Sequence, residues 1–254
     1  MKSKVVLNDF TFLIIVRLDS ISRLENILIC SDFLVNNFLT EVHVMECAPY
    51  NNGLLNKVLN KKVKYSFLED NDFIFHRTKL LNRMTTTVET QFVSVWDSDV
   101  IIPIDQIVKS ANLLRNGGFD FVYPYEKRFL DSSAILRKLF IQEGKLEILE
   151  MNASKMKEMY LPVPVGGAFF ANLKSYLEAG MENELYYGWG LEDGERLYRW
   201  ENLGYKIQRV QGCLFHLTHE KGINSTFHND DQKYLKRKLT LGTKIKKKFE
   251  TPQK

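Results

Sequence analysis

Apolar runs alternate with polar breaks along most of the chain, and the pattern predicts strands alternating with helices. Residues 10–16 are continuously apolar, as in a strand buried on both faces, and residues 41–47 alternate in polarity like a second strand. Residues 24–34 keep helical spacing, with Ser20 or Ser22 as the cap. This order favours an α/β fold with a mainly parallel central sheet and helices on both faces.

The same alternation continues to about residue 210. Residues 131–157 mix polar and apolar positions and predict helix, as an insertion over a site. No internal repeat is present, and the only biased segment is a basic stretch at the end. Further strands are expected at residues 63–68, 92–97, 119–123, 162–171 and 205–210, and further helices from about 76, at 104–116, at 175–179 and up to about 200.

The length of 254 residues allows one large α/β domain or two small ones, and an apolar content of 44% is enough for a full core. No apolar run approaches the roughly 18 residues that span a bilayer, and the first nine residues lack the apolar core of a secretion signal. Cys30, Cys47 and Cys213 are far apart and have no metal-binding spacing. They predict reduced thiols in a cytoplasmic protein.

The net charge of +4 is unevenly distributed, because residues 233–254 form a basic tail. One interpretation is a solvated tail. Another is peripheral attraction to the anionic inner face of a membrane, worth about 1 kcal/mol per basic residue near the surface. No nucleic-acid motif accompanies the charges, so nucleic acid is not an expected partner. Eight basic residues crowd the part of this tail before residue 249: Lys233, Lys236, Arg237, Lys238, Lys244, Lys246, Lys247 and Lys248.

Two aspartates interrupt the apolar run that starts at residue 92. Asp97 and Asp99 lie two residues apart, so in an extended backbone both side chains project to one side. Carboxylates that converge at a strand's carboxyl end repel each other unless a cation lies between them. Mg²⁺ or Mn²⁺ carrying a diphosphate would satisfy them. A D-x-D triplet alone is usually an ordinary pair of loop carboxylates, but this one lies where open α/β sheets bind ligands.

His216 and His219 are the candidates for completing a metal site. Three-residue spacing lets both rings face one way only on a helical turn, so in an extended loop we expect one firm ligand rather than two. A mixed aspartate and histidine set suits Mn²⁺ better than Ca²⁺.

A second acidic pair, Glu192 and Asp193, follows the turn Gly188-Trp189-Gly190. The glycines permit close approach of a ligand, and Trp189 offers a flat apolar face to a sugar ring. The alternative is that the two acids only complement the dipole of a helix that begins there.

Five charged residues are expected at strand ends or at a helix start: Arg17, Asp19, Glu46, Arg77 and Lys79. In a nucleotide site, Asp19 and Glu46 would hydrogen-bond a uridine, and Arg77 would meet phosphate. Alternatively, some of them are salt-bridged residues at the rim.

Taken in order, these motifs resemble the β1,4-galactosyltransferase-related glycosyltransferases of the GT-A fold, including bacterial capsule and polysaccharide enzymes. Residues 75–82 (FHRTKLLN) and 96–99 (WDSD) resemble that family's F-N-R-A-K-L-L-N block and D-x-D. Residues 166–169 (GGAF) and 188–193 (GWGLED) resemble its G-G and G-W-G-x-E-D blocks. Residues 16–19 (VRLD) resemble the first-strand motif of related bacterial members. The matches cover most of the chain.

The resemblance implies a role for each candidate residue. Asp193 would be the catalytic base, and Asp99 with His216 or His219 would bind Mn²⁺ or Mg²⁺. The donor would contact Gly167. Asp97 would lie near the ribose, and Arg77 would contact the nucleotide. Trp189 would lie against the sugar, and Glu192 would lie beside that sugar.

The resemblance also implies an activity and a domain plan. The family is inverting, so the reaction would move a hexose, galactose or N-acetylgalactosamine, from a UDP-sugar donor to a saccharide acceptor in capsule or surface polysaccharide synthesis. Residues 1–232 would form one domain, with a nucleotide-binding half at about 8–125 and an acceptor-binding half at about 126–232. Leu191, His76 and His216 depart from the family pattern and leave donor sugar and metal preference open.

Two other functions remain to be weighed. A sugar nucleotidyltransferase would also use carboxylates and a metal, but it usually has a glycine-rich basic loop after the first strand, and residues 17–23 contain no glycine. A non-catalytic saccharide-binding module with a decayed site would not be expected to retain Asp97, Asp99, Asp193 and His216.

Overall fold

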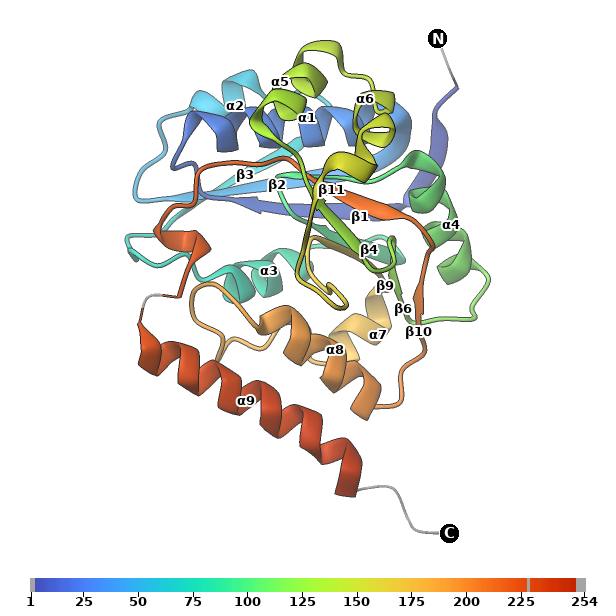
Figure 1. Ribbon diagram of the computed structural model, residues 1–254, viewed down its shortest axis with the longest axis vertical. Coiled ribbons are helices and arrows are strands. Elements are labelled where there is room, and N and C mark those ends of the chain that lie inside the picture. Colours follow the sequence, from blue (N-terminus) through green and yellow to red (C-terminus); the bar gives the residue numbers. More distant parts are fainter. Residues whose placement is uncertain (1–2, 228, 250–254) are drawn as a thin grey trace.

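A seven-stranded sheet forms the centre of the computed structural model, which describes residues 3–227 and 229–249 (Figure 1). All its strands pair in parallel except β9, which is antiparallel to both β4 and β6. The sheet confirms the α/β expectation. In the order β10-β6-β9-β4-β1-β2-β3, the strands are β10 (Ile207–Arg209), β6 (Phe121–Tyr123), β9 (Ala168–Asn172), β4 (Phe92–Trp96), β1 (Val5–Val16), β2 (Phe38–Ala48) and β3 (Lys64–Glu69).

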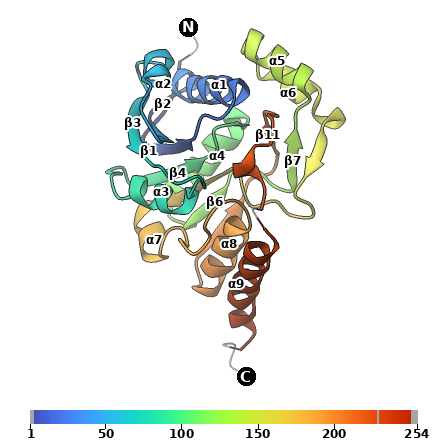
Figure 2. The same ribbon diagram turned by 90° about the vertical axis from the view of Figure 1, so that its left-hand side faces the viewer.

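Helices cover both faces of this sheet. The helices α1 (Ile21–Asn37) and α2 (Leu54–Val58) lie on one side, and α3 (Arg77–Thr85), α7 (Leu173–Glu178) and α8 (Glu192–Asn202) lie on the other (Figures 1 and 2). α4 (Ile104–Arg115) packs against β6 and β9. Ser20 is the cap of α1, since its hydroxyl accepts a hydrogen bond from the backbone N–H of Arg23 at 3.2 Å.

A second, four-stranded sheet was not expected from the sequence. Its order is β5 (Val100–Ile101), β11 (Cys213–His216), β7 (Arg128–Asp131) and β8 (Lys157–Met159). Strands of two to four residues are too short to show a period of two. The interval 131–157 is therefore not purely helical: α5 (Ala134–Glu143), α6 (Glu147–Met151) and the 3-10 turn Ala153–Lys155 are flanked by β7 and β8.

Aromatic packing fixes the position of α8 on the large sheet. Trp200 of α8 stacks on Phe121 of β6 with ring centroids 3.7 Å apart, and both side chains are fully buried. Aromatic side chains of this size contribute much of the apolar area that a core buries. Because Trp200 is anchored, the first turn of α8, which carries Glu192 and Asp193, is held at the sheet.

Most of the basic stretch at the end of the chain lies in a helix, α9 (Asp230–Phe249), which runs along α8 (Figure 1). Lys236 is buried in that contact, and its ammonium donates to the carbonyl of Trp189 at 2.8 Å. Residues 250–254, and the side chains of 245–249, lie outside the described part of the basic stretch.

Among the described residues, no helix has the length and apolar character needed to cross a bilayer. All three cysteines are free thiols.

Candidate functional site

Asp99 and two histidines form a cluster where the two sheets meet. Asp99 directly precedes β5, and His216 ends β11, where it pairs with Val100. The Nε2 atoms of His219 and His216 lie 3.1 and 3.8 Å from Oδ2 of Asp99. A hydrogen bond of 2.7 Å from the N–H of Leu217 to the carbonyl of Asp99 ties the two segments together.

Both histidines, rather than only one, lie within reach of Asp99, which differs from our expectation. His216 is still in the strand, but the chain leaves the strand after it and turns His219 back toward the same carboxylate. The two ring centroids are 5.4 Å apart. The side chains of His216 and His219 were expected to diverge along a straight extended backbone, and the backbone between them is not straight.

The hydrogen bonds of the two rings fix which nitrogen faces Asp99. Nδ1 of His216 donates to Oδ1 of Asp131 at 2.8 Å, and Nδ1 of His219 donates to the carbonyl of Glu220 at 2.7 Å. In the neutral ring, each Nε2 then carries a lone pair. Two lone pairs and a carboxylate oxygen facing one another repel, so the arrangement needs extra protons or a bound cation. The three ligand atoms, all within 4.8 Å of one another, fit a divalent ion such as Mn²⁺ or Zn²⁺.

The electrostatics of the cluster agree with this geometry. Burial by itself would raise the pKa of Asp99, but His216, His219 and Arg23 outweigh it and hold that pKa well below its usual range. Burial opposes protonation of His216, yet Asp99 and Asp131 raise the pKa of its ring. Positive charge is thus favoured at this position, whether it comes from protons or from a metal ion.

Asp97 has a different partner from Asp99. Its Oδ1 accepts a hydrogen bond of 2.5 Å from Nη2 of Arg77, the first residue of α3, and its backbone N–H donates to the carbonyl of Gly167 at 2.8 Å. Burial raises the pKa of Asp97, Arg77 lowers it, and Asp99 and Asp193 raise it further. The charges of Asp99 and Asp193 therefore both act on Asp97.

Asp193, the expected base, is held by a buried arginine that the sequence did not single out. Nη2 of Arg196 donates to Oδ1 of Asp193 at 2.7 Å, and Nη1 forms a pair with Glu182 at 3.0 Å. Arg196 and Glu182 are almost fully buried, whereas 28% of the Asp193 side chain is exposed. A Cβ on Gly166 would lie 2.7 Å from Oδ2 of Asp193, so a larger residue there would displace this carboxylate from its position.

Glu192 lies beside Asp193 in a drier environment. Its Oε2 is buried without a hydrogen-bond partner, as is Nη1 of Arg77. Burial, and then the charge of Asp193, raise the pKa of Glu192 to about 7. Buried polar atoms without partners are rare in proteins, and at a site they indicate groups that a ligand would satisfy.

Trp189 and Gly167 have structural contacts as well as positions near the site. Trp189 is half-buried and meets Phe227 edge to face, with ring centroids 5.3 Å apart. Gly167 has φ +82°, and a Cβ there would lie 2.7 Å from Leu214 and 2.9 Å from Phe129. Glycine is thus required at 167 by both backbone conformation and space.

The three remaining nucleotide candidates are bound to protein partners. Arg17 pairs with Asp70 at 2.8 Å, and Asp19 pairs with Arg23 at 2.9 Å. Glu46 is buried and accepts a hydrogen bond from the hydroxyl of Tyr65 at 2.7 Å. Arg17 and Asp19 thus form the salt bridges of the alternative interpretation, whereas Glu46 is a buried carboxylate hydrogen-bonded to a tyrosine.

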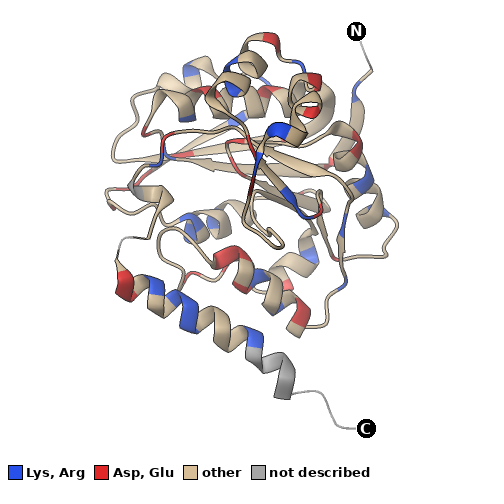
Figure 3. Ribbon diagram, viewed as in Figure 1, with Lys and Arg blue, Asp and Glu red and all other residues tan. Residues whose placement is uncertain are grey.

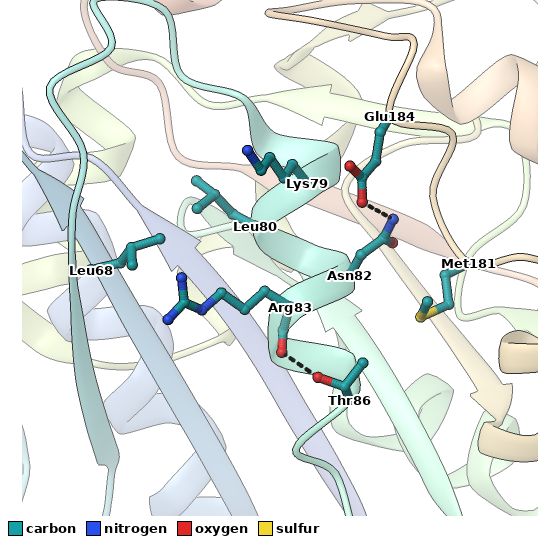
Figure 4. Close-up of a pocket in the computed structure, with 8 residues that line it drawn as sticks. All are labelled: Leu68, Lys79, Leu80, Asn82, Arg83, Thr86, Met181 and Glu184. Carbon is teal, nitrogen blue, oxygen red and sulfur yellow. Dashed lines mark hydrogen bonds between the residues drawn. The ribbon is translucent and has the colours of Figure 1, made fainter.

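Lys79 lines a hollow that contains none of the other candidate residues (Figure 4). Asn82, which ends the FHRTKLLN block, also lines it and donates to Glu184 at 2.9 Å and to the carbonyl of Glu182 at 2.9 Å. These bonds attach α3 to the loop that leads to Trp189. The last asparagine of the motif thus has a structural function here.

Four residues around the site were missed by sequence reasoning: Arg23, Asp131, Tyr160 and Arg196. Asp131 and Tyr160 flank the interval that predicts helix, and Arg23 and Arg196 look like ordinary charges on amphipathic helices. Tyr160, with φ +58°, packs edge to face on Phe129. Burial and the charges of Asp97 and Asp99 raise the pKa of Tyr160 to about 12.

Comparison with known proteins finds solved structures of the same fold and a family-model match in the carboxyl-terminal part of the chain. Residues 161–222, about a quarter of the chain, match the model of a family described as the N-terminal domain of galactosyltransferase. This segment includes Gly167, Trp189, Glu192, Asp193, His216 and His219. No curated protein matches the chain.

Solved structures share its architecture at low sequence identity. The catalytic domain of Drosophila beta1,4-galactosyltransferase 7 in complex with xylobiose is 14% identical, with a TM-score of 0.55 over 90% of this chain and 79% of that one. Glucosyl-3-phosphoglycerate synthase from Mycobacterium tuberculosis, with Mn²⁺, UDP and phosphoglyceric acid, is 14% identical, with a TM-score of 0.54 over 96% of this chain and 79% of that one. A mutant of the Drosophila enzyme was solved with manganese, UDP-Gal and xylobiose. The chain therefore has the GT-A fold, and the fold and the matching segment together support an enzyme of the glycosyltransferase class.

Proposed function

We propose that the protein is a metal-dependent inverting glycosyltransferase that moves a hexose from a UDP-sugar to a saccharide hydroxyl. The observation that carries the proposal is the cluster of Asp99, His216 and His219, in which two imidazole lone pairs and a carboxylate face one another. Asp97 lies beside this cluster, and the charge of Asp193 contributes to raising the pKa of Asp97. The solved complexes of similar fold, which hold Mn²⁺ with UDP or UDP-Gal, support the same assignment.

Asp99, His216 and His219 would hold the ion, and their mixed oxygen and nitrogen set suits Mn²⁺. When bound, such an ion would neutralise charge on the diphosphate leaving group. The unpartnered Nη1 of Arg77 is a further donor at the site that a phosphate or ribose oxygen could occupy.

Asp193 would act as the general base. As the acceptor oxygen bonds to the anomeric carbon and the bond to UDP breaks, the hydroxyl proton passes to the Asp193 carboxylate. Arg196 holds one of its oxygens and is itself neutralised by Glu182, so the carboxylate is oriented without being buried. The unpartnered Oε2 of Glu192 and the half-buried ring of Trp189 would contact the sugar.

The finer assignment is also a proposal. Galactose or N-acetylgalactosamine is the donor sugar suggested by the galactosyltransferase-type segment at residues 161–222. The acceptor would be a growing saccharide of a bacterial capsule or surface polysaccharide, which the resemblance implies. The reaction would take place in the cytoplasm.

Calorimetric titration of UDP with and without Mn²⁺ tests the proposal directly. The transferase should bind UDP in a metal-dependent manner, and a screen of UDP-sugars should reveal Mn²⁺-dependent hydrolysis of one of them. UDP binding that does not depend on Mn²⁺, or no UDP binding at all, would contradict the proposal and favour a saccharide-binding module. Formation of a UDP-sugar from UTP and a sugar phosphate would indicate a nucleotidyltransferase.

We also propose peripheral membrane contact through α9. Its outer surface carries exposed Arg237 and Lys238 beside Leu235 and Leu241, which are 53% and 55% exposed. Figure 3 shows basic residues along this helix, and such a surface would be attracted to anionic lipid.

Because α9 packs on α8, charge reversal tests membrane contact better than deletion does. Replacing Arg237 and Lys238 by Glu should reduce co-sedimentation with phosphatidylserine vesicles. The control pair, Lys61→Glu with Lys62→Glu, changes exposed residues of the turn before β3. Equal sedimentation of both variants and the unaltered protein would count against membrane contact.

A further inference from the structure

Asp131 lies behind the metal-ligand cluster and contacts one of its histidines. It is the last residue of β7, and the parallel pairing of β7 with β11 puts it directly opposite His216. Its Oδ1 accepts the hydrogen bond of 2.8 Å from Nδ1 of His216. The Asp131 side chain is 26% exposed and that of His216 is 16% exposed, so protein encloses most of this contact.

We propose that Asp131 is a positioning residue that fixes the tautomer and orientation of His216. A carboxylate has no proton to donate at neutral pH, so the ring nitrogen facing it must carry the hydrogen. Nε2 of His216 is then left as an acceptor, and this is the atom that lies 3.8 Å from Asp99. A carboxylate behind a ligating histidine also makes the imidazole a more basic ligand.

The backbone around Asp131 reinforces this contact. The N–H of Ser132 donates to the carbonyl of His216 at 2.9 Å, and the N–H of Thr218 donates to the hydroxyl of Ser132 at 3.2 Å. Ser132 thus holds the segment that carries both histidines. The small sheet therefore has a function in assembling the site.

His219 provides an internal comparison. Its Nδ1 donates to the backbone carbonyl of Glu220, the next residue, so its orientation does not depend on Asp131. A change at Asp131 should therefore alter His216 and leave His219 as it was. A general loosening of the structure would alter both rings.

The test measures both the tautomer and the affinity for Mn²⁺, and the inference rests on the proposed metal site. In metal-free protein with ¹⁵N-labelled histidine, at a pH where the rings are neutral, both rings should show a protonated Nδ1. Asp131→Asn supplies an amide that can donate to Nδ1, so a substantial share of His216 should become protonated at Nε2, while His219 stays unchanged. Mn²⁺ binding, followed by electron paramagnetic resonance without nucleotide, should weaken about 10- to 100-fold.

Two further variants keep the result interpretable. Asp131→Ala leaves His216 without an orienting partner and should also weaken Mn²⁺ binding. Glu158→Gln changes a carboxylate of the neighbouring strand β8, which pairs with Arg128 at 2.9 Å, and should leave both readouts unchanged.

Three outcomes would overturn the inference. One is an unchanged His216 tautomer together with unchanged Mn²⁺ affinity in Asp131→Asn. Another is an equal loss of affinity in Glu158→Gln, which would indicate a merely structural effect. The third is the absence of Mn²⁺ binding to the unaltered protein, which would remove the metal site itself and is recognised before any variant is made.

Discussion

The two sheets contribute different chemistry to one site. At the end of the seven-stranded sheet, Asp97 pairs with the arginine that begins α3, and nearby Asp193 pairs with a buried arginine of α8. At the end of the four-stranded sheet, Asp99 meets two histidines, one of which is supported by Asp131. The large sheet thus presents carboxylates that are already paired with arginine, and the small sheet presents a set that still calls for a cation.

The difference explains why two aspartates only two residues apart are not equivalent. Asp97 follows β4 and is bonded through its backbone to Gly167 of the large-sheet region, whereas Asp99 is bonded through its carbonyl to Leu217 beyond β11. The D-x-D triplet therefore crosses from one sheet to the other. Each aspartate takes its partners from the sheet it joins.

The largest expected effect is on the base. Asp193→Asn should lower transfer about 10²- to 10⁴-fold, because an amide cannot accept the acceptor's proton. UDP binding should persist, since Arg196 keeps its pair with Glu182. Transfer is measured as the amount of saccharide product. The control is Asp105→Asn, which changes an exposed side chain of α4. If the Asp193→Asn variant kept full activity, Asp193 would not be the general base.

The next effect compares the two aspartates of the triplet. Asp99→Asn should weaken Mn²⁺ binding at least about 10- to 100-fold, because it removes a ligand itself, whereas Asp97→Asn should change it by less than about threefold in the absence of nucleotide. Titration of Mn²⁺ into each variant measures this difference. Equal losses would mean that both carboxylates hold the ion and that the two sheets are not distinct in function.

The contact between the sheets can be broken at Gly167. Gly167→Ala should destabilise the protein by about 1–3 kcal/mol, because its φ is positive and the new methyl group would meet Leu214 of β11 and Phe129 of β7. Gly118→Ala is the matched control, since a Cβ there meets nothing within 4 Å. Urea unfolding measures both. A similar loss in the two variants would show that packing between the sheets is not responsible.

The smallest effect concerns the pH dependence of stability through Glu192. Its pKa in the folded protein is about 7 against an ordinary value of 4.5, so between these pH values the folded chain keeps a proton that the unfolded chain releases. Stability from this group therefore falls as pH rises through that window, by at most about 1.4 kcal/mol per pH unit. The Glu192→Gln variant should lack this pH dependence. Its free energy of unfolding, relative to that of the unaltered protein, should therefore be higher at pH 8 than at pH 5. Parallel pH profiles of the two proteins would contradict the assignment.

Much of the large sheet was predictable because its strands are long enough to show their burial. The continuous apolar run of β1 and the run that ends at Asp97 each indicated a buried strand, and both are strands of that sheet. Asp97, Asp99 and Asp193 were predictable for a related reason, since each follows a recognisable boundary between an apolar or glycine-rich segment and a polar one. Arg196 was not, because nothing in a helical sequence distinguishes a buried arginine from an exposed one.

The sequence by itself determined the α/β class, the position of the triplet at the end of a buried strand, and the residue types available for a metal site. Only the tertiary structure decided that both histidines reach Asp99, that Asp131 supports one of them, and that Arg17, Asp19 and Glu46 are bonded to protein partners. The physical reason is range. Burial and periodicity are local properties of a few consecutive residues, whereas these contacts join segments up to 120 residues apart through strands too short to be recognised alone.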